Sequence, residues 1–178
     1  MVTNRKTLCF TGHRPNKLAD YSGPKVDALH SAIKNKLIDV VIRASNAGFN
    51  TFISGGALGV DQIAARAVIH VRDVLNRNVE LEMAIPFPAQ PNGWPENARQ
   101  TYFTLLNASN SVVYCSQDPF SSAKMRKRNM WMVDHSEVVV AIYNNTGGGT
   151  KNCIDYARNM KRPVLIINPF TLEERWEH

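Results

Sequence analysis

The sequence of 178 residues predicts an α/β fold, a single Rossmann-like doubly wound domain over residues 1–178 with a mainly parallel sheet. Strand-like and helix-like segments alternate along the whole chain, and the strand-like segments are apolar on both faces. No break in composition and no internal repeat divides the chain. Strands that are apolar on both faces are typical of a parallel sheet covered by helices on two sides.

Short apolar segments predict strands in the first half of the chain, and amphipathic segments predict helices. Residues 8–10 form the first short strand. Apolar positions at helical spacing predict a helix over residues 25–47, and Gly48 follows it where a C-terminal glycine is expected. A strand, a helix and a strand then follow, over residues 51–53, 60–71 and 79–85.

The second half begins with a loop over residues 86–95, because four prolines and one glycine in this segment prevent regular structure. The segment 138–143 is the strongest strand of the chain, since all of its residues are apolar or aromatic. In chain order, the expected elements are helix 96–107, strand 111–115, helix 121–133, strand 138–143, helix 150–160 and strand 164–167.

The composition indicates an intracellular protein with an anionic partner. Residues 1–6 lack the apolar core of a signal peptide, and no apolar run reaches the roughly 18 residues of a membrane span. We therefore expect a soluble cytoplasmic protein without membrane association. A net charge of +6 and a pI near 9.4 favour an anionic partner, although the basic cluster at 124–128 is also typical of a solvated helix face.

Cysteines and histidines do not form a recognisable metal site. The three cysteines lie far apart, and none of the five histidines belongs to a pair with metal-ligand spacing. We therefore expect neither a metal nor a cofactor.

The first strand runs directly into Gly12, His13, Arg14 and Pro15. In doubly wound sheets, ligands bind beyond the carboxyl ends of the strands, which is where this turn lies. We expect His13 and Arg14 to form one wall of a ligand site. The planar guanidinium of Arg14 is suited to contact with phosphate oxygens.

A second glycine-bearing turn, SGGALGVD, covers residues 54–61 and resembles a dinucleotide fingerprint in which Ser54 replaces the first glycine. Gly55, Gly56 and Gly59 are candidates for close approach of a ligand to the start of the next helix. The acidic ribose ligand of an NAD site is missing, because Pro86 stands where it is expected. A tight turn that packs a helix against a strand is the alternative interpretation.

A third turn, NNTGGGTKNC, covers residues 144–153 and follows the strongest strand. Gly148, Gly149 and Thr150 at a helix start are typical of a phosphate cradle. The spacing to a Gly-Lys-Ser/Thr triplet is absent, which argues against P-loop ATP hydrolysis. A flexible surface loop is the alternative here.

Five segments occur in the same order as in a known family: CFTGHRPNKL, FISGGALGVDQIAA, AIPFP, KRNMWMVDHSEVVVAIYN and GGGTKNCIDYA. Together, over residues 7–169, they resemble the YpsA-like branch of the SLOG (Smf/DprA–LOG) superfamily. The resemblance implies a Rossmann-like domain that binds a nucleotide or a nucleotide-derived ligand, for example of the ADP-ribose type. LOG-type relatives cleave the base from a nucleoside monophosphate, DprA-type relatives bind single-stranded DNA, and others are nucleotide sensors.

The LOG pattern places a glutamate where this chain has Cys153, when the two are aligned on Gly149 and Thr150. A neutral thiol does not replace that carboxylate, so the LOG reaction is not expected from the same residues. Asp61 is the remaining candidate for catalysis at an N-glycosidic bond, and helix capping is an equally open role for it. Arg128 and Asn129 are expected to reach over the strand edge toward the ligand.

These observations favour a protein that binds a small nucleotide ligand, either as a sensor or as an N-glycosidic hydrolase or transferase. Phe87 and Trp94, on the proline-rich loop, are candidates for stacking on a base or for simple packing. A DprA-type single-stranded nucleic-acid binder and a non-catalytic interaction scaffold remain the alternatives. We expect a homodimer or a higher homo-oligomer.

Overall fold

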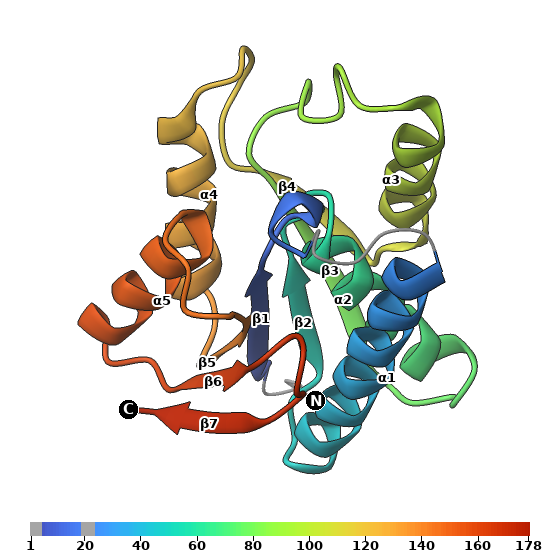
Figure 1. Cartoon of the computed structure of the whole chain (residues 1–178), viewed down its shortest axis with the longest axis vertical. Coiled ribbons are helices and arrows are strands. Elements are labelled where there is room, and N and C mark those ends of the chain that lie inside the picture. The colour runs from blue at the N-terminus through green and yellow to red at the C-terminus, as the bar shows by residue number, and fades with distance from the viewer. Residues whose placement is uncertain (1–4, 19–23) are drawn as a thin grey trace.

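The computed structural model describes residues 5–18 and 24–178, and within them one sheet of seven strands forms the centre of the molecule (Figure 1). Residues 1–4, part of the segment without a signal-peptide core, lie outside the described residues. The strands are β1 (Thr7–Gly12), β2 (Thr51–Ser54), β3 (Glu80–Ile85), β4 (Ser111–Tyr114), β5 (Val138–Ile142), β6 (Val164–Ile167) and β7 (Glu174–Glu177). Their order in the sheet is β4-β3-β2-β1-β5-β6-β7, and every pair except β6–β7 is parallel.

Helices cover both faces of this sheet. One face carries α1 (Pro24–Asn46), α2 (Val60–Asp73) and α3 (Glu96–Ala108), and the other carries α4 (Ser122–Asp134) and α5 (Gly149–Asn159) (Figure 1). A short 3-10 helix, η1 (Pro15–Lys17), follows β1. The predicted doubly wound, mainly parallel fold is therefore confirmed.

The central strand β1 contributes side chains to both halves of the hydrophobic core. Leu8 and Phe10 pack with the cluster under α1, α2 and α3, whereas Cys9 packs with the cluster under α4 and α5. This division follows from the alternation of side chains along a strand. It explains why the central strand segments carry apolar residues on both faces.

The order of the strands reverses beside β1. The chain moves outward from β1 through β2 and β3 to β4, and then returns to place β5 on the other side of β1. The loops after β1 and β5 therefore lead to helices on opposite faces of the sheet. Such a switch point is where doubly wound folds open a crevice for ligands.

Two details differ from the sequence-based expectation. β1 continues to Gly12, which pairs with Ile142, and a Cβ at Gly12 would overlap the Val60 side chain of α2. The antiparallel strand β7 was not expected, because its four residues are mostly charged and lie at the sheet edge. Among the described residues, no helix has the length and apolar character to cross a membrane.

Candidate functional site

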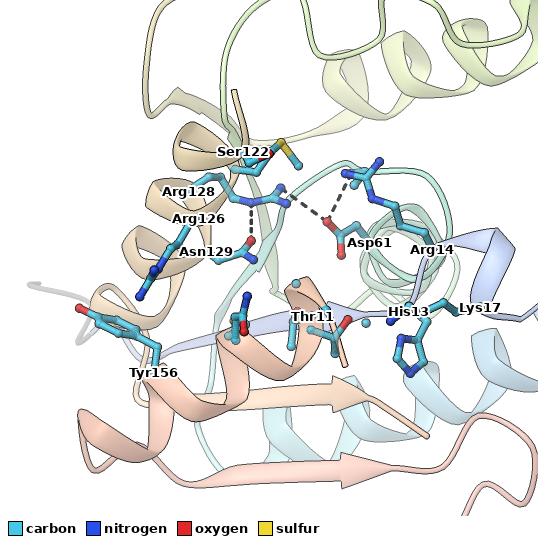
Figure 2. Close-up of a pocket in the computed structure, with 18 of the residues that line it drawn as sticks. Thr11, His13, Arg14, Lys17, Asp61, Ser122, Arg126, Arg128, Asn129 and Tyr156 are labelled. Carbon is cyan, nitrogen blue, oxygen red and sulfur yellow. Dashed lines mark hydrogen bonds and ion pairs between the residues drawn. The ribbon is translucent and has the colours of Figure 1, made fainter. Parts of the chain in front are cut away.

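A cavity of about 530 Å³ lies beyond the carboxyl ends of β1 and β5, at the switch point (Figure 2). Its walls come from the turn after β1, the start of α2, one side of α4 and the start of α5. It brings together these residues singled out in the sequence: Gly12, His13, Arg14, Asp61, Arg128, Asn129, Gly148, Gly149 and Thr150. The other four, Ser54, Gly55, Gly56 and Gly59, are not among its lining residues.

His13 joins the end of β1 to the loop after β5. Its buried ring accepts a hydrogen bond at Nε2 from the backbone N–H of Asn144 at 3.1 Å, and packs 5.5 Å from the Tyr143 ring. Burial lowers the pKa of His13 below its ordinary value, which favours the neutral ring that this acceptor role requires. His13 therefore positions the cavity wall, and the exposed Arg14 beside it faces the cavity.

Arg128 connects α4 to the loop after β2 and to strand β3. Its side chain is 4% exposed, and Nη1 lies 3.5 Å from Oδ2 of Asp61. The same nitrogen donates to the carbonyl oxygens of Gly55 and Ala84, while Nε donates to Oδ1 of Asn129 at 2.9 Å. Most donors of this guanidinium are therefore used within the protein, so Arg128 supports the cavity wall more than it can serve a ligand.

Asp61 is a buried carboxylate between two cations. It accepts a hydrogen bond from the backbone N–H of Ala57 at 3.3 Å, and Figure 2 shows the side chains of Arg14 and Arg128 pointing toward it. Burial raises the pKa of Asp61 above its ordinary value, and the charges of Arg128 and Arg14 oppose that shift. A carboxyl group with a raised pKa at a cavity wall is suited to proton transfer.

The first two glycines of the turn after β2 are required by packing inside the protein. A Cβ at Gly55 would overlap the guanidinium of Arg128. Gly56 has φ of +67°, and a Cβ there would lie 2.9 Å from Cε of Met83 and 3.3 Å from the Tyr102 ring. These glycines therefore face side chains of the protein.

Gly59 and Ser54 also stabilise the cavity wall, through contacts within the protein and not with the cavity. Gly59 has φ of +94°, a left-handed conformation that favours glycine, and a Cβ there would lie 2.6 Å from the carbonyl oxygen of His13. The Ser54 hydroxyl donates to the carbonyl oxygen of Asp61 at 2.7 Å. The turn thus holds α2 close to the end of β1.

The start of α5 differs from this arrangement, because its residues Gly148, Gly149 and Thr150 line the cavity. Gly148, the N-cap residue, has φ of +126°, and no side chain caps the helix or places an acidic group in its first turn. A Cβ at Gly147 or Gly149 would meet no atom within 4 Å. Uncapped amides at a helix N-terminus attract anions.

Two cationic side chains in the lining were missed by the sequence analysis. Lys17, in η1, donates through Nζ to the carbonyl oxygen of Gly147 and so reaches the loop before α5. Arg126 lies on α4, three residues before Asn129, and this helical spacing places both on one face. Further lining residues include Asn16, Ser122, Met125, Asn152 and Tyr156.

Cys153 is buried at the start of α5. Burial raises the pKa of its thiol to about 11, although a hydrogen bond with Thr11 opposes the shift. The thiol is therefore protonated near neutral pH and is not an activated nucleophile. Among the described residues, no three His, Cys, Asp or Glu side chains gather as a metal-binding group.

Comparison with known proteins shows relatives along nearly the whole chain. The family model YpsA, described as the YspA SLOG family, matches residues 8–171. The SPbeta prophage-derived protein YoqJ of Bacillus subtilis (strain 168) is 33% identical over 138 residues, covering 71% of this chain and 80% of YoqJ. A UPF0398 protein of Bacillus thuringiensis (strain Al Hakam) is 26% identical and covers 97% of this chain and 98% of its own.

Two solved structures share the fold. DNA processing protein A from Helicobacter pylori, studied for its single-stranded DNA binding mode, superposes with a TM-score of 0.62 at 19% identity. That match covers 95% of this chain and 68% of the other. DNA processing protein A (DprA) from Streptococcus pneumoniae has a TM-score of 0.59 at 14% identity, covering 96% of this chain and 53% of the other.

Proposed function

Because the chain belongs to the YspA SLOG family, we propose that the cavity at its switch point binds the phosphorylated ribose of a nucleotide or nucleotide-derived ligand. One observation carries this proposal. The uncapped N-terminus of α5 and the guanidinium of Arg14 face the same cavity at the carboxyl ends of the strands.

The charges around the cavity favour an anion. Arg14, Lys17 and Arg126 line it, whereas Asp61 is the sole carboxylate among the described lining residues and lies beside Arg128. Backbone amides and a planar guanidinium are suited to phosphate oxygens. A volume of about 530 Å³ also lies within the usual range for small-molecule sites.

Binding can be tested by calorimetry with ribose 5-phosphate and with ribose. We expect the wild type to bind the phosphorylated sugar and not ribose. We expect Arg14→Gln to weaken that binding about 10- to 100-fold, because a charge-assisted hydrogen bond is lost. Arg99→Gln is the matched control, because it removes the same charge from the exposed surface of α3 and leaves the affinity unchanged. Equal affinity for ribose and ribose 5-phosphate would refute the proposal.

The same site allows either a sensor or an enzyme that cleaves an N-glycosidic bond. In the enzyme, Asp61 would deliver its proton to the departing base while water, or an acceptor in a transferase, forms the new bond to C1′ of the ribose and gives up a proton in turn; the raised pKa of Asp61 is consistent with this role. Released base can be followed by chromatography in the wild type and in Asp61→Asn. Release that is lost in Asp61→Asn, while ribose 5-phosphate still binds, supports the enzyme; unchanged release removes Asp61 from that role.

Single-stranded DNA is a second candidate ligand, favoured by the similarity to the DprA structures and by the exposed basic residues 126 and 127 on α4. Binding to a DNA strand releases counterions, so its affinity falls steeply with salt. A steep salt dependence with oligonucleotides, together with no binding of ribose 5-phosphate, would favour this candidate over the first.

A further inference from the structure

A second cavity, of about 460 Å³, adjoins the first. Both are lined by Arg14, Phe120 and Met125, so the two form a continuous depression. The second lies between the proline-rich loop, residues 86–95, and the loop before α4. The two loops lie at the same end of the sheet in Figure 1, and the backbone N–H of Ala89 donates to Oδ1 of Asp118 at 2.7 Å.

The walls of the second cavity are aromatic. Phe87 is buried, and its ring meets the edge of the Phe120 ring at a centroid distance of 5.7 Å. Phe120 itself is 66% exposed, and Trp94 lines the cavity while packing on Tyr102. Aromatic walls with a face exposed to solvent are suited to stacking on a flat heterocycle.

Gln90 supplies an acceptor at this cavity that lacks a donor. Gln90 is among the residues that line the cavity although it is 7% exposed, and its Nε2 donates to the carbonyl oxygen of Gly55 at 3.3 Å. Among the described residues, no group donates to the buried Oε1 of Gln90. A buried acceptor without a donor costs free energy, so a ligand that offers an N–H group gains by supplying one.

We propose that the second cavity binds the base of the ligand, and that it selects a base with an exocyclic amino group. This inference rests on the proposed function, because the ribose phosphate must occupy the first cavity for the base to pass Arg14 and enter the second. The base stacks on Phe120 and its amino group donates to Oε1 of Gln90. The carboxylate of Asp118 adds a second acceptor at the rim.

Three ligands separate the contributions of the ribose phosphate, the purine ring and the amino group to binding. They are ribose 5-phosphate, purine riboside 5′-monophosphate and AMP, which differs from the purine riboside monophosphate only by its amino group. We expect AMP to bind about tenfold more tightly than the purine riboside, and the purine riboside more tightly than ribose 5-phosphate. In Gln90→Met the two purine ligands bind equally. In Phe120→Ala both purine ligands lose about tenfold more affinity than ribose 5-phosphate, because Phe120 lines both cavities but stacks only on the base. Phe103→Ala, which truncates an exposed aromatic residue on α3, leaves all three affinities unchanged.

The outcomes distinguish the two proposals. If ribose 5-phosphate binds but neither purine ligand binds more tightly, the base site is refuted and the phosphate site stands. Equal binding of the two purine ligands by the wild type refutes the selection of an amino group. If none of the three binds, the phosphate site is refuted and the base site with it. Because Phe120 is exposed, its substitution is not expected to disturb folding, and a melting curve verifies this.

Discussion

Two turns of this protein carry the same sequence feature, glycines between a parallel strand and a helix, and the structure uses them in opposite ways. In the turn over residues 54–59, side chains of the protein fill the space beyond the glycines. In the turn over residues 147–149, a Cβ at the first or last glycine would meet no atom within 4 Å. The first turn therefore supports the cavity wall, whereas the second lines the cavity at a helix start without a side-chain cap.

The difference arises from one long side chain. Arg128 reaches from α4 to the carbonyl oxygen of Gly55, 73 positions away in the chain, and pairs with Asp61 at the start of α2. The start of α2 is therefore occupied by a carboxylate of the protein, Asp61, which accepts from the backbone N–H of Ala57 and pairs with Arg128. At the start of α5, Lys17 reaches the carbonyl oxygen of Gly147 and a Cβ at Gly148 would lie 2.8 Å from its Nζ, but no side chain caps the helix and its first turn holds no acidic group, so an external anion can still be attracted there. A glycine-bearing turn thus indicates that another group approaches its backbone closely, but that group can be a side chain of the protein and need not be a ligand.

The largest loss of stability is expected when a methyl group is added to a glycine in the turn over residues 54–59. Gly55→Ala places a Cβ on the guanidinium of Arg128, which must leave Asp61, and loss of one partner of a buried ion pair costs about 3–5 kcal/mol. Urea unfolding measures this loss. Gly147→Ala is the matched control and changes the free energy of unfolding little, because it enters open space. Equal losses in the two variants would remove the distinction between the turns.

A somewhat smaller loss of stability is expected when Arg128 itself is replaced. Arg128→Leu removes the buried cation beside the Asp61 carboxylate, leaves only the exposed Arg14 near it, and costs about 3 kcal/mol. The double variant Asp61→Leu/Arg128→Leu should be more stable than Arg128→Leu alone, because no buried charge remains unpaired. A double-mutant cycle by urea unfolding measures the coupling. Additive losses would show that the pair does not hold the first turn in place.

The smallest effect on stability is expected at His13, which accepts hydrogen bonds from the backbone N–H of Val60 at the start of α2 and of Asn144 after β5. Because burial lowers its pKa, the folded protein binds a proton at this ring less readily than the unfolded chain. The stability from neutral His13 is therefore present above the unfolded pKa near 6.5, and is lost as the pH falls through the lower folded value. Melting temperatures between pH 7 and pH 5 should fall more in the wild type than in His13→Gln. Parallel pH profiles would exclude His13 as the cause.

Much of the fold was predictable, because the apolar strand segments and amphipathic helices are local patterns. β7 was not, since Glu174–Glu177 pairs only at the sheet edge and carries no continuous apolar pattern. In the site, Arg14 and the glycines at the start of α5 could be predicted, because they come shortly after the ends of recognisable strands. The partners of Gly55 and the contact of Lys17 with Gly147 depend on residues far apart in the chain, which local patterns do not reveal.

The central claim is that the bare N-terminus of α5 binds a phosphate, and Gly149→Asp tests it most directly by calorimetry with ribose 5-phosphate. Gly149→Asn is the control of similar shape without charge. A carboxylate in the first turn should stabilise the helix by about 0.3–1 kcal/mol. It should also repel the ligand, so the account predicts that Gly149→Asp melts no lower than the wild type and binds at least about tenfold more weakly than Gly149→Asn. Equal binding of ribose 5-phosphate by the two variants would contradict the account.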